Sequence, residues 1–390
     1  MKLVITSNTS WFVYNFFRFS ITEFLVDGNQ VYVLAPEDKY SAYLKDLGCE
    51  FFDLKMSRSG VNAKQEIVTI KRINAVISAL EPDCVLNFTP KLNIYSALVS
   101  RYRNIPVINS VAGLGAIFSE GGIKAKLGKK LLSFTQPLVD HVVFQNNDDW
   151  KVYLDHGYVS LTNSSRVRGI GINLKKFVPH EAPDDGVTRF VLVARMLKTK
   201  GVHEFVAAAQ AVEEHYNVRR LAGIEVPRYQ FSLLGFVDQK NPQGVPRELL
   251  QHWHDTTLVD YLGATDDVFS IVKDYDCVVL PSYYREGIPQ CLIEAASMAK
   301  PIITTDNVGC RETVIDGQSG FLVKPQSVPE LKEAMIKMIE LGHQHRVRLG
   351  QRGRRKAETE FCHLEVSNHY LKVIEQVTKN RKTKLEPQPS

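Results

Sequence analysis

Short apolar runs rich in β-branched residues alternate with helix-length segments along the whole chain. Runs of this kind, bounded by polar or turn-forming residues, are typical of strands buried on both faces of a parallel sheet. Such strands are predicted at 2–6, 30–35, 83–87, 106–110, 140–145, 189–194, 229–234, 259–262, 277–280, 301–305 and 320–323. Sheets of this class bind ligands at the carboxyl ends of their strands.

The strands fall into two sets, which predicts two doubly wound, Rossmann-like α/β domains. The segment 179–186, rich in Pro, Asp and Gly, separates the sets as a linker would. We expect an N-terminal domain over 1–180, a second domain over 187–365, and a C-terminal helix with a frayed tail over 366–390. A chain of 390 residues has room for two domains of ordinary size. The active site is expected in the cleft where the two domains face each other.

Charge is distributed unevenly along the chain. The formal net charge is +5, but residues 1–180 carry +6, residues 181–342 carry −7 and residues 343–390 carry +6. If the tail returns to the first domain, a basic N-terminal domain stands opposite an acidic second one. Such an asymmetry bears on partners and not on the fold. The basic ends carry no module that reads a nucleic-acid groove, so a nucleic-acid partner is not expected.

The six cysteines show no CxxC pair and no metal-ligand spacing. Reduced thiols and no metal centre are therefore expected. No stretch approaches the ~18 uninterrupted apolar residues that a membrane-spanning helix needs. We expect a cytoplasmic protein whose association with the inner face of the cell membrane is peripheral.

The most informative pattern follows the predicted strand 277–280. A loop with Glu286 and Gly287 leads through Pro289 into a helix that carries Glu294. Glycine lets a ligand approach the backbone, and proline suits the first turn of a helix, whose exposed amides favour an anion. Two carboxylates at this spacing can hold hydroxyl groups at two ends of a sugar nucleotide. Glu294 alone also fits a solvated helix face, but its apolar neighbours make an unpaired carboxylate costly there.

A second pattern follows the predicted strand 189–194. Arg195 and Lys200 lie at the carboxyl end of this strand, before the next helix. Two cations in this position can hold a diphosphate and neutralise the charge that develops as it leaves. Taken alone, a basic loop is equally well explained by solvation.

Together, Ala-Arg-x4-Lys-Gly at 194–201 and Glu-Gly-x-Pro-x4-Glu-Ala at 286–295 resemble the family-4 retaining glycosyltransferases of the GT-B fold. The continuation over 300–323, with Gly-Cys-Arg-Glu at 309–312, is similar to the same family. The resemblance implies an α/β protein with two Rossmann-like domains facing across a cleft. It also implies a C-terminal helix that returns to the N-terminal domain.

The resemblance assigns roles to the residues of both patterns. Arg195 and Lys200 would bind the donor diphosphate, Glu286 would contact hydroxyls of the transferred sugar, and Glu294 would contact the ribose. Arg195, Lys200 and Glu286 are the catalytic residues that it implies. The implied donor-binding set is Arg195, Lys200, Gly263, Glu286, Gly287, Ile288, Pro289 and Glu294. The family works without a metal or other cofactor and retains the anomeric configuration, by same-face attack.

Segments 87–93, 109–115 and 144–149 resemble bacterial members that extend lipid-diphosphate-linked sugars for capsule, O-antigen, lipopolysaccharide or protein glycan, such as galactosaminyltransferases. This implies a UDP-sugar donor and an acceptor linked to undecaprenyl diphosphate. Many relatives carry a Gly-Gly loop after the first strand and a cleft histidine, and this chain has neither at the matching positions. The expected acceptor or cleft contacts are Asn8, Asn87, Lys91, Asn109, Gly113 and Gly115.

Two N-terminal segments suggest contact with an anionic membrane surface. Residues 11–19 are unusually aromatic, and residues 121–132 form a basic amphipathic pattern of the kind found at membrane surfaces. The basic positions are Lys124, Lys126, Lys129 and Lys130. Packing of the aromatics against a sheet and ordinary solvation of the lysines are the alternative interpretations.

The leading interpretation is a retaining transferase that moves a hexose or N-acetylhexosamine from a UDP-sugar onto a lipid-diphosphate-linked saccharide. Two alternatives stay open, a UDP-sugar epimerase of the same fold and an inactive transferase-like partner in a polysaccharide assembly complex. The two charged pairs favour transfer.

Overall fold

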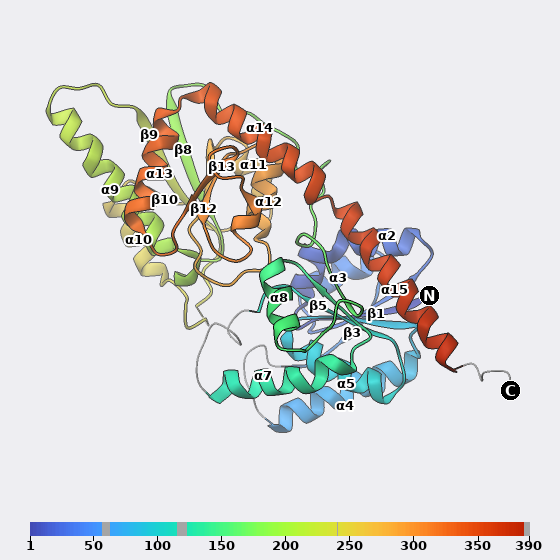
Figure 1. Ribbon diagram of the computed structural model, residues 1–390. Coiled ribbons are helices and arrows are strands. Elements are labelled where there is room, and N and C mark those ends of the chain that lie inside the picture. The colour runs from blue at the N-terminus through green and yellow to red at the C-terminus, as the bar shows by residue number, and fades with distance from the viewer. Residues whose placement is uncertain (57–62, 115–122, 240, 386–390) are drawn as a thin grey trace. The chain divides into compact units, whose positions relative to one another are not determined.

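The computed structural model describes residues 1–56, 63–114, 123–239 and 241–385, and it divides into two compact units (Figure 1). Unit 1 comprises Met1–Gly171 with His363–Ser390, and unit 2 comprises Ile172–Cys362. Each unit is built on its own parallel sheet, as the alternation of strands and helices predicts.

Unit 2 begins before the boundary expected from the sequence, because residues 172–186 pack on it. Arg354 Nη1 and the Ser297 hydroxyl both donate to the carbonyl oxygen of Phe177, each at 2.8 Å. At the other boundary, unit 2 ends at Cys362 rather than at 365.

The sheet of unit 1 has the strand order β3-β2-β1-β4-β5-β6-β7 among the described residues. Its strands are β1 (Lys2–Thr6), β2 (Gln30–Ala35), β3 (Glu50–Asp53), β4 (Cys84–Phe88), β5 (Val107–Val111), β6 (His141–Phe144) and β7 (Ser164–Arg166). The edge strands β3 and β7 were not predicted. β3 has only two apolar residues, both half-buried, and β7 has none, so neither contains the buried apolar run on which the prediction depends.

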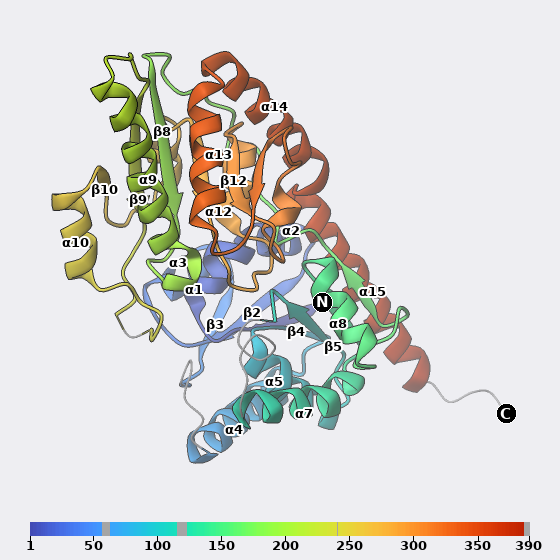
Figure 2. The same ribbon diagram turned by 60° about the vertical axis from the view of Figure 1, so that its left-hand side comes forward.

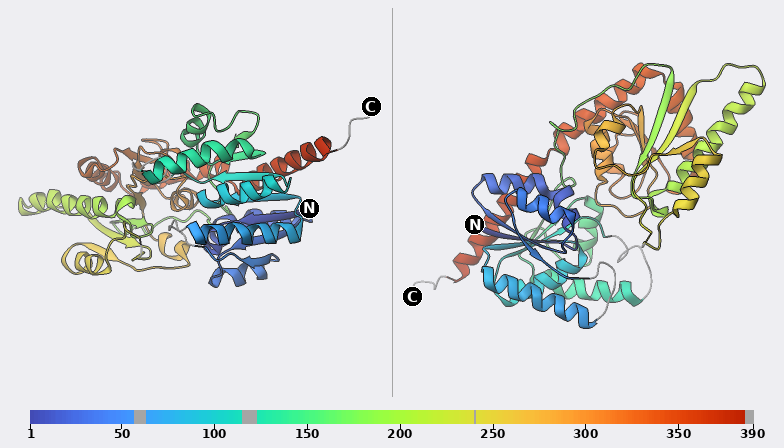
Figure 3. Two further views of the ribbon diagram at one scale, coloured as in Figure 1. Left: turned by 90° about the horizontal axis from the view of Figure 1, so that it is seen from below. Right: turned by 180° about the vertical axis from the view of Figure 1, so that it is seen from behind.

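Helices cover both faces of this sheet (Figure 3). One face carries α4 (Ala63–Leu80), α5 (Pro90–Tyr102), α7 (Ile123–Thr135), η2 (Gln136–Leu138) and α8 (Asn147–Asp155). The other carries α1 (Ser10–Phe12), the π-helical turn η1 (Val13–Phe17), α2 (Arg18–Val26) and α15 (His363–Leu385), with α3 (Lys39–Asp46) beside η1.

The C-terminal helix α15 returns to the N-terminal domain, as the resemblance implies, and packs along α2. Ser367 Oγ donates to Ser20 Oγ at 3.0 Å, and the hydroxyls of Tyr370 and Ser110 are 2.7 Å apart. Both contacts are buried, so α15 is an integral part of unit 1.

The aromatic segment 11–19 packs mainly within unit 1. Phe17 is 1% exposed, and its ring contacts those of Phe24, Phe88 and Tyr370. The packing interpretation is confirmed for Phe17, so the membrane interpretation rests on α7.

The sheet of unit 2 has the order β10-β9-β8-β11-β12-β13 among the described residues. Its strands are β8 (Val187–Val193), β9 (Arg228–Leu234), β10 (Val259–Tyr261), β11 (Cys277–Leu280), β12 (Ile302–Thr305) and β13 (Gly320–Val323). One face is covered by α9 (Val202–Leu221), α10 (Arg247–Thr256) and α13 (Val328–Glu340), with α9 and α13 side by side (Figure 2). The other carries α11 (Val268–Val272), α12 (Gln290–Ser297) and α14 (His343–Glu360). Two short turns complete the unit, η3 (Lys198–Lys200) and η4 (Arg311–Thr313).

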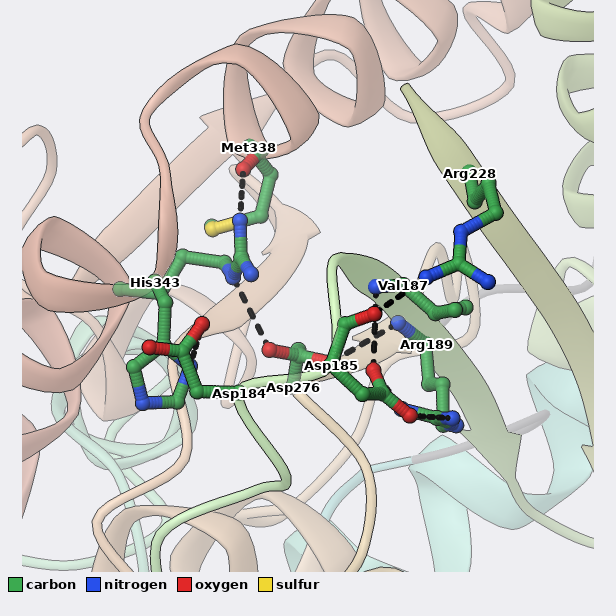
Figure 4. Close-up of polar contacts among 9 residues, drawn as sticks. Asp184, Asp185, Val187, Arg189, Arg228, Asp276, Met338 and His343 are labelled. Carbon is green, nitrogen blue, oxygen red and sulfur yellow. Dashed lines mark hydrogen bonds and ion pairs between the residues drawn. The ribbon is translucent and has the colours of Figure 1, made fainter.

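A polar network with a buried ion pair at its centre joins strands and helices at the amino edge of this sheet (Figure 4). Asp276, just before β11, accepts a hydrogen bond from the Arg189 backbone N–H at 2.9 Å. Its other oxygen lies 3.0 Å from Nε of Arg346 on α14. Arg189 also pairs with Asp185, whose Oδ2 lies 2.6 Å from Nη2. The network therefore anchors α14 and the segment before β8 to the amino edge of the sheet. Arg195, Lys200 and Glu286 follow the strands at the opposite, carboxyl edge.

The unit bounds reduce the charge contrast expected from the sequence. Helix α14, which carries much of the positive charge of the tail, belongs to unit 2. Unit 1 holds 24 Lys and Arg against 18 Asp and Glu, a formal +6, and unit 2 holds 24 against 25, a formal −1. The expectation of a strongly acidic second domain is therefore wrong.

Candidate functional site

The two charged patterns of unit 2 meet at the carboxyl edge of its sheet, because β8 and β11 are neighbouring parallel strands. The turn η3 follows β8, and the loop with Glu286 follows β11. Gly201 ends η3 with φ +76°, and a Cβ at this position would lie 2.2 Å from the Pro281 carbonyl oxygen. Only glycine allows this approach, which brings the two loops together.

Hydrogen bonds hold the two loops in register. The Thr199 carbonyl oxygen accepts from the backbone N–H groups of Tyr283 at 3.1 Å and Tyr284 at 3.3 Å. On the far side, a Cβ on Gly309 would lie 1.9 Å from the Gly287 carbonyl oxygen, so the loop is backed by a second glycine. The loop conformation is thus set by backbone contacts from two neighbouring segments.

Lys200 and Glu286 form a sheltered ion pair in this arrangement. Lys200 Nζ lies 2.5 Å from Glu286 Oε1, and the side chains are 15% and 12% exposed. Burial lowers the pKa of the Lys200 ammonium, but the charge and hydrogen bond of Glu286 outweigh it and the pKa is raised. Lys200 therefore carries its charge at neutral pH and can offer it to an anion.

Arg195 and Glu294 complete the charged set. Arg195 is 43% exposed, with Nη1 3.6 Å from Asp238 Oδ2. Glu294 is half-buried on α12, and Pro289 is the N-cap residue just before that helix. Both charged groups are accessible enough to meet a polar ligand.

A glycine pair lies on the β9 side of the same edge. Gly235 donates its N–H to the Gly263 carbonyl oxygen at 2.8 Å, and its own carbonyl oxygen accepts from the Tyr261 hydroxyl at 2.9 Å. A Cβ on Gly235 would lie 1.7 Å from the Ala194 carbonyl oxygen. The expected donor-binding residue Gly263 therefore belongs to the same strand edge as Arg195.

In unit 1, Asn87 and Asn109 form a buried ladder across the carboxyl edge of the sheet. Asn87 accepts from the Thr6 hydroxyl at 2.7 Å and donates to Asn109 Oδ1 at 2.9 Å. Asn109 in turn donates to the Asn93 carbonyl oxygen and to Gln136 Oε1. Both asparagines are 0% exposed, so their amides join β1, β4, β5 and η2.

Lys91 and Thr89 lie at the start of α5 on the same edge. Lys91 Nζ is 2.6 Å from Glu66 Oε1 of α4. Thr89 has φ 74° and a buried hydroxyl oxygen that makes no hydrogen bond to the described residues. A positive φ in a β-branched residue before proline is strained, by about 1–3 kcal/mol, and such residues cluster at functional sites. Of the other expected contacts, Asn8 and Gly113 are half-buried, and Gly115 lies outside the described residues.

Several residues at these edges were not predicted from the sequence. Ser282, Asp238 and Glu66 contact Glu286, Arg195 and Lys91 respectively. Ser282 lies two residues after the last residue of β11, where polar strand-end residues commonly contact ligands, and this position could have marked it. Asp238 and Glu66 have no comparable local signal.

Helix α7 presents an apolar stripe that the described residues of unit 1 leave exposed. Leu127, Leu131 and Phe134 are 52%, 37% and 66% exposed, and their spacing puts them on one side of the helix. Lys126 and Lys130 are exposed beside them. The side chain of Lys124 lies outside the described residues.

The cysteines are free thiols, and four of the six are buried. Among the described residues, no group of three or more His, Cys, Asp or Glu side chains is placed to hold a metal ion. None of the described helices combines the length and apolar character that a bilayer-spanning segment requires.

Two family models match the chain in succession. Residues 2–146 match the model described as Glycosyl transferase 4-like, and residues 175–356 match the model described as Glycosyl transferases group 1. The two matches contain the predicted site residues of units 1 and 2.

Similar proteins include two bacterial sugar transferases whose names contain an acceptor linked to undecaprenol through a diphosphate. The chain is 26% identical to the N,N'-diacetylbacillosaminyl-diphospho-undecaprenol alpha-1,3-N-acetylgalactosaminyltransferase of Campylobacter jejuni, over 97% of this chain and 100% of that protein. It is 23% identical to the UDP-Gal:alpha-D-GlcNAc-diphosphoundecaprenol alpha-1,3-galactosyltransferase of Escherichia coli, over 83% of this chain and 84% of that protein.

Among solved structures, the HepE protein of Anabaena in complex with UDP-glucose aligns with a TM-score of 0.74 at 15% identity. The alignment covers 96% of this chain and 100% of that one, which supports the fold. The fold and both family matches lead to one assignment. The fold has two parallel Rossmann-like sheets, and its C-terminal helix packs on unit 1. The chain belongs to the group 1, family-4 glycosyltransferases of the GT-B fold.

Proposed function

We propose that this protein transfers a hexose or N-acetylhexosamine from a UDP-sugar to a saccharide linked to a lipid diphosphate, with retention of anomeric configuration and without a metal. The observation that supports this proposal most directly is the sheltered Lys200–Glu286 pair, which lies with Arg195 at the carboxyl edge of the unit 2 sheet. The relatives from Campylobacter jejuni and Escherichia coli, whose names include diphosphoundecaprenol or diphospho-undecaprenol acceptors, support the acceptor class.

In the proposed reaction, charged side chains at the carboxyl edge of the unit 2 sheet bind the donor. Lys200 and Arg195 bind the donor diphosphate and stabilise the negative charge that develops as UDP leaves. Glu286 accepts hydrogen bonds from the sugar hydroxyls, and Glu294 from the ribose. Backbone groups of Gly287, Ile288 and Pro289 line the sugar and phosphates, and Gly263 lies beside the base.

Lys200 changes partners in this scheme. Its Nζ contacts Glu286 Oε1 in the structure, and part of its hydrogen-bonding capacity turns to phosphate when a donor enters. An ammonium has three donors, so it can contact a phosphate oxygen while staying near the carboxylate. The acceptor hydroxyl then attacks on the face from which the phosphate departs, and the departing phosphate takes its proton.

The acceptor half is assigned to the carboxyl edge of the unit 1 sheet. Lys91, Asn8, Gly113 and Gly115 are the proposed contacts of the lipid-linked saccharide. Lys91 supplies a cation near the start of α5, where backbone N–H groups also favour a phosphate. Asn87 and Asn109 shape this edge through their buried ladder.

Peripheral docking on the inner face of the cell membrane completes the proposal. Helix α7 offers an apolar stripe flanked by lysines, which suits insertion at an anionic surface. The lipid-linked acceptor is confined to such a surface, so docking brings the enzyme to its substrate.

The deciding experiment incubates the purified protein with a panel of UDP-sugars, with and without undecaprenyl-diphosphate-linked saccharides. Transfer with retained configuration is the expected result. Inversion at C2 of the donor sugar would instead indicate an epimerase, and no turnover with any pair would indicate an inactive assembly partner.

A further inference from the structure

Ser282 contacts both segments of the proposed donor site, the turn η3 after β8 and the loop after β11 that carries Glu286. It follows Pro281 in the loop after β11 and is 0% exposed. Its hydroxyl has one proton and two acceptors in reach, Glu286 Oε1 at 2.9 Å and the Thr199 carbonyl oxygen at 3.2 Å. The Tyr284 N–H approaches the Ser282 hydroxyl oxygen at 3.3 Å. The shorter contact is with the carboxylate, and a charged acceptor makes the stronger hydrogen bond.

Ser282 and Lys200 share one oxygen of Glu286. Both the hydroxyl and the ammonium approach Oε1, at 2.9 Å and 2.5 Å. In the proposed function, Lys200 turns toward the donor diphosphate when substrate binds. The carboxylate then loses part of the charge that compensates its burial, and a sheltered carboxylate without such partners is costly and poorly oriented.

Ser282 can keep its contact while Lys200 moves. Its backbone is fixed by Thr305, whose hydroxyl donates to the Ser282 carbonyl oxygen at 2.5 Å. Its short side chain has a single rotatable bond to the hydroxyl oxygen, so the oxygen stays near Glu286. Lys200, by contrast, has a long flexible side chain suited to changing partners.

We propose that Ser282 is a positioning residue that keeps the Glu286 carboxylate oriented toward the sugar hydroxyls while Lys200 engages the donor diphosphate. This inference rests on the proposed function, because it takes the roles of Glu286 and Lys200 from it. Ser282 acts through Glu286 and not by contact with the substrate.

The test compares Ser282→Ala with Ser282→Thr, which keeps a hydroxyl, and with Thr304→Val. Thr304 is equally buried, and its hydroxyl donates to the Leu280 carbonyl oxygen at 2.7 Å, so Thr304→Val removes a neighbouring buried hydroxyl whose hydrogen bond goes to β11. For Ser282→Ala we expect kcat with the UDP-sugar to fall about 10-fold, which corresponds to about 1.4 kcal/mol. The Kd for UDP, measured by calorimetry, is expected to stay within about 2-fold, because phosphate binding by Lys200 and Arg195 is retained. Ser282→Thr is expected to recover much of kcat, and Thr304→Val to keep it.

Two outcomes would overturn the inference. In one, Ser282→Ala keeps the kcat of the unchanged protein. In the other, Ser282→Ala and Thr304→Val lose activity, UDP affinity and melting temperature alike, as a merely structural role requires. Glu286→Gln separates this failure from failure of the proposed function. If Glu286→Gln is fully active, the proposed role of the carboxylate itself is wrong, and if it is inactive while Ser282→Ala is not, the positioning role alone is wrong.

Discussion

Lys200 Nζ and Glu286 Oε1 lie 2.5 Å apart, although 86 residues separate them in the chain. The pair forms because parallel pairing of β8 with β11 puts the ends of both strands at one edge, and Gly201 lets the two loops touch. The cation and the carboxylate to which we assign the donor diphosphate and the sugar hydroxyls therefore lie side by side.

Removal of either partner should lower the rate of sugar transfer. For Lys200→Ala or Glu286→Ala, we expect turnover to fall at least about 10-fold, because each side chain is assigned more than about 1.4 kcal/mol of transition-state stabilisation. Steady-state rates with the best UDP-sugar of the panel measure this. Full activity in either variant would contradict the role assigned to that residue.

Gly201→Ala should destabilise unit 2. The new Cβ would lie 2.2 Å from the Pro281 carbonyl oxygen, at a backbone φ of +76°. Gly223→Ala is the matched control, because its φ is +75° with no atom within 4 Å of the new Cβ. Alanine at positive φ costs more than about 1 kcal/mol, and the clash should add to this at Gly201. Equal melting temperatures for the two variants would show that the loops can separate without cost.

The buried pair Asp276–Arg346 should contribute far more to stability than an exposed pair of similar geometry. Its side chains are 1% and 7% exposed, so Asp276→Ala leaves a buried guanidinium without its carboxylate, at a cost of about 3–5 kcal/mol. The control is Asp306→Ala, since Asp306 lies 2.7 Å from Arg311 with side chains 61% and 38% exposed. That change should cost at most about 1 kcal/mol. Urea unfolding measures both, and similar midpoints would contradict the assignment.

Unit 1 should lose stability as pH falls from about 6.5 toward 4. His141 is 6% exposed, and burial together with nearby His369 lowers its pKa to about 4. Both imidazoles contact the Ser165 hydroxyl, each at 2.8 Å. Between pH 4 and 6.5 the unfolded chain binds the proton more tightly, so the stability that neutral His141 contributes is present above about pH 6.5 and is lost below it. Full protonation costs on the order of 3 kcal/mol.

His141→Gln tests this pH dependence, with the exposed His156→Gln as control. Urea midpoints at pH 5 and pH 7.5 should differ less for His141→Gln than for the unchanged protein. The control should behave like the unchanged protein. If His141→Gln keeps the full pH dependence, other groups are responsible.

Charge reversal on α7 should weaken binding to anionic vesicles. Each basic side chain near an anionic leaflet contributes about 1 kcal/mol, so changing Lys126 and Lys130 to Glu should reduce the partition coefficient at least about 10-fold. Vesicle sedimentation with phosphatidylglycerol-containing liposomes measures this. Changing the exposed Lys175 and Lys176 of unit 2 to Glu is the matched control. Equal binding of both variants would contradict docking through α7.

The sequence determined the architecture and supplied the residues of the candidate donor site. Largely apolar runs of four to six residues mark most of the buried strands, because a strand covered on both faces is nearly continuous in apolar side chains. β1 and β2 were predicted with the bounds that the structure has. The spacing of Arg195, Lys200, Glu286 and Glu294 also identified the family.

The tertiary structure decided which residues meet across long distances in the chain. Pairing of distant segments sets two of the contacts, that of Ser282 with Glu286 and that of Glu66 with Lys91. Packing of the helices likewise decides that one side of α7 is exposed. The same holds for the short edge strands β3 and β7 and for the packing of residues 172–186 on unit 2. Local sequence periodicity indicates whether a residue is buried. Which residue it contacts depends on how segments distant in the chain pack together.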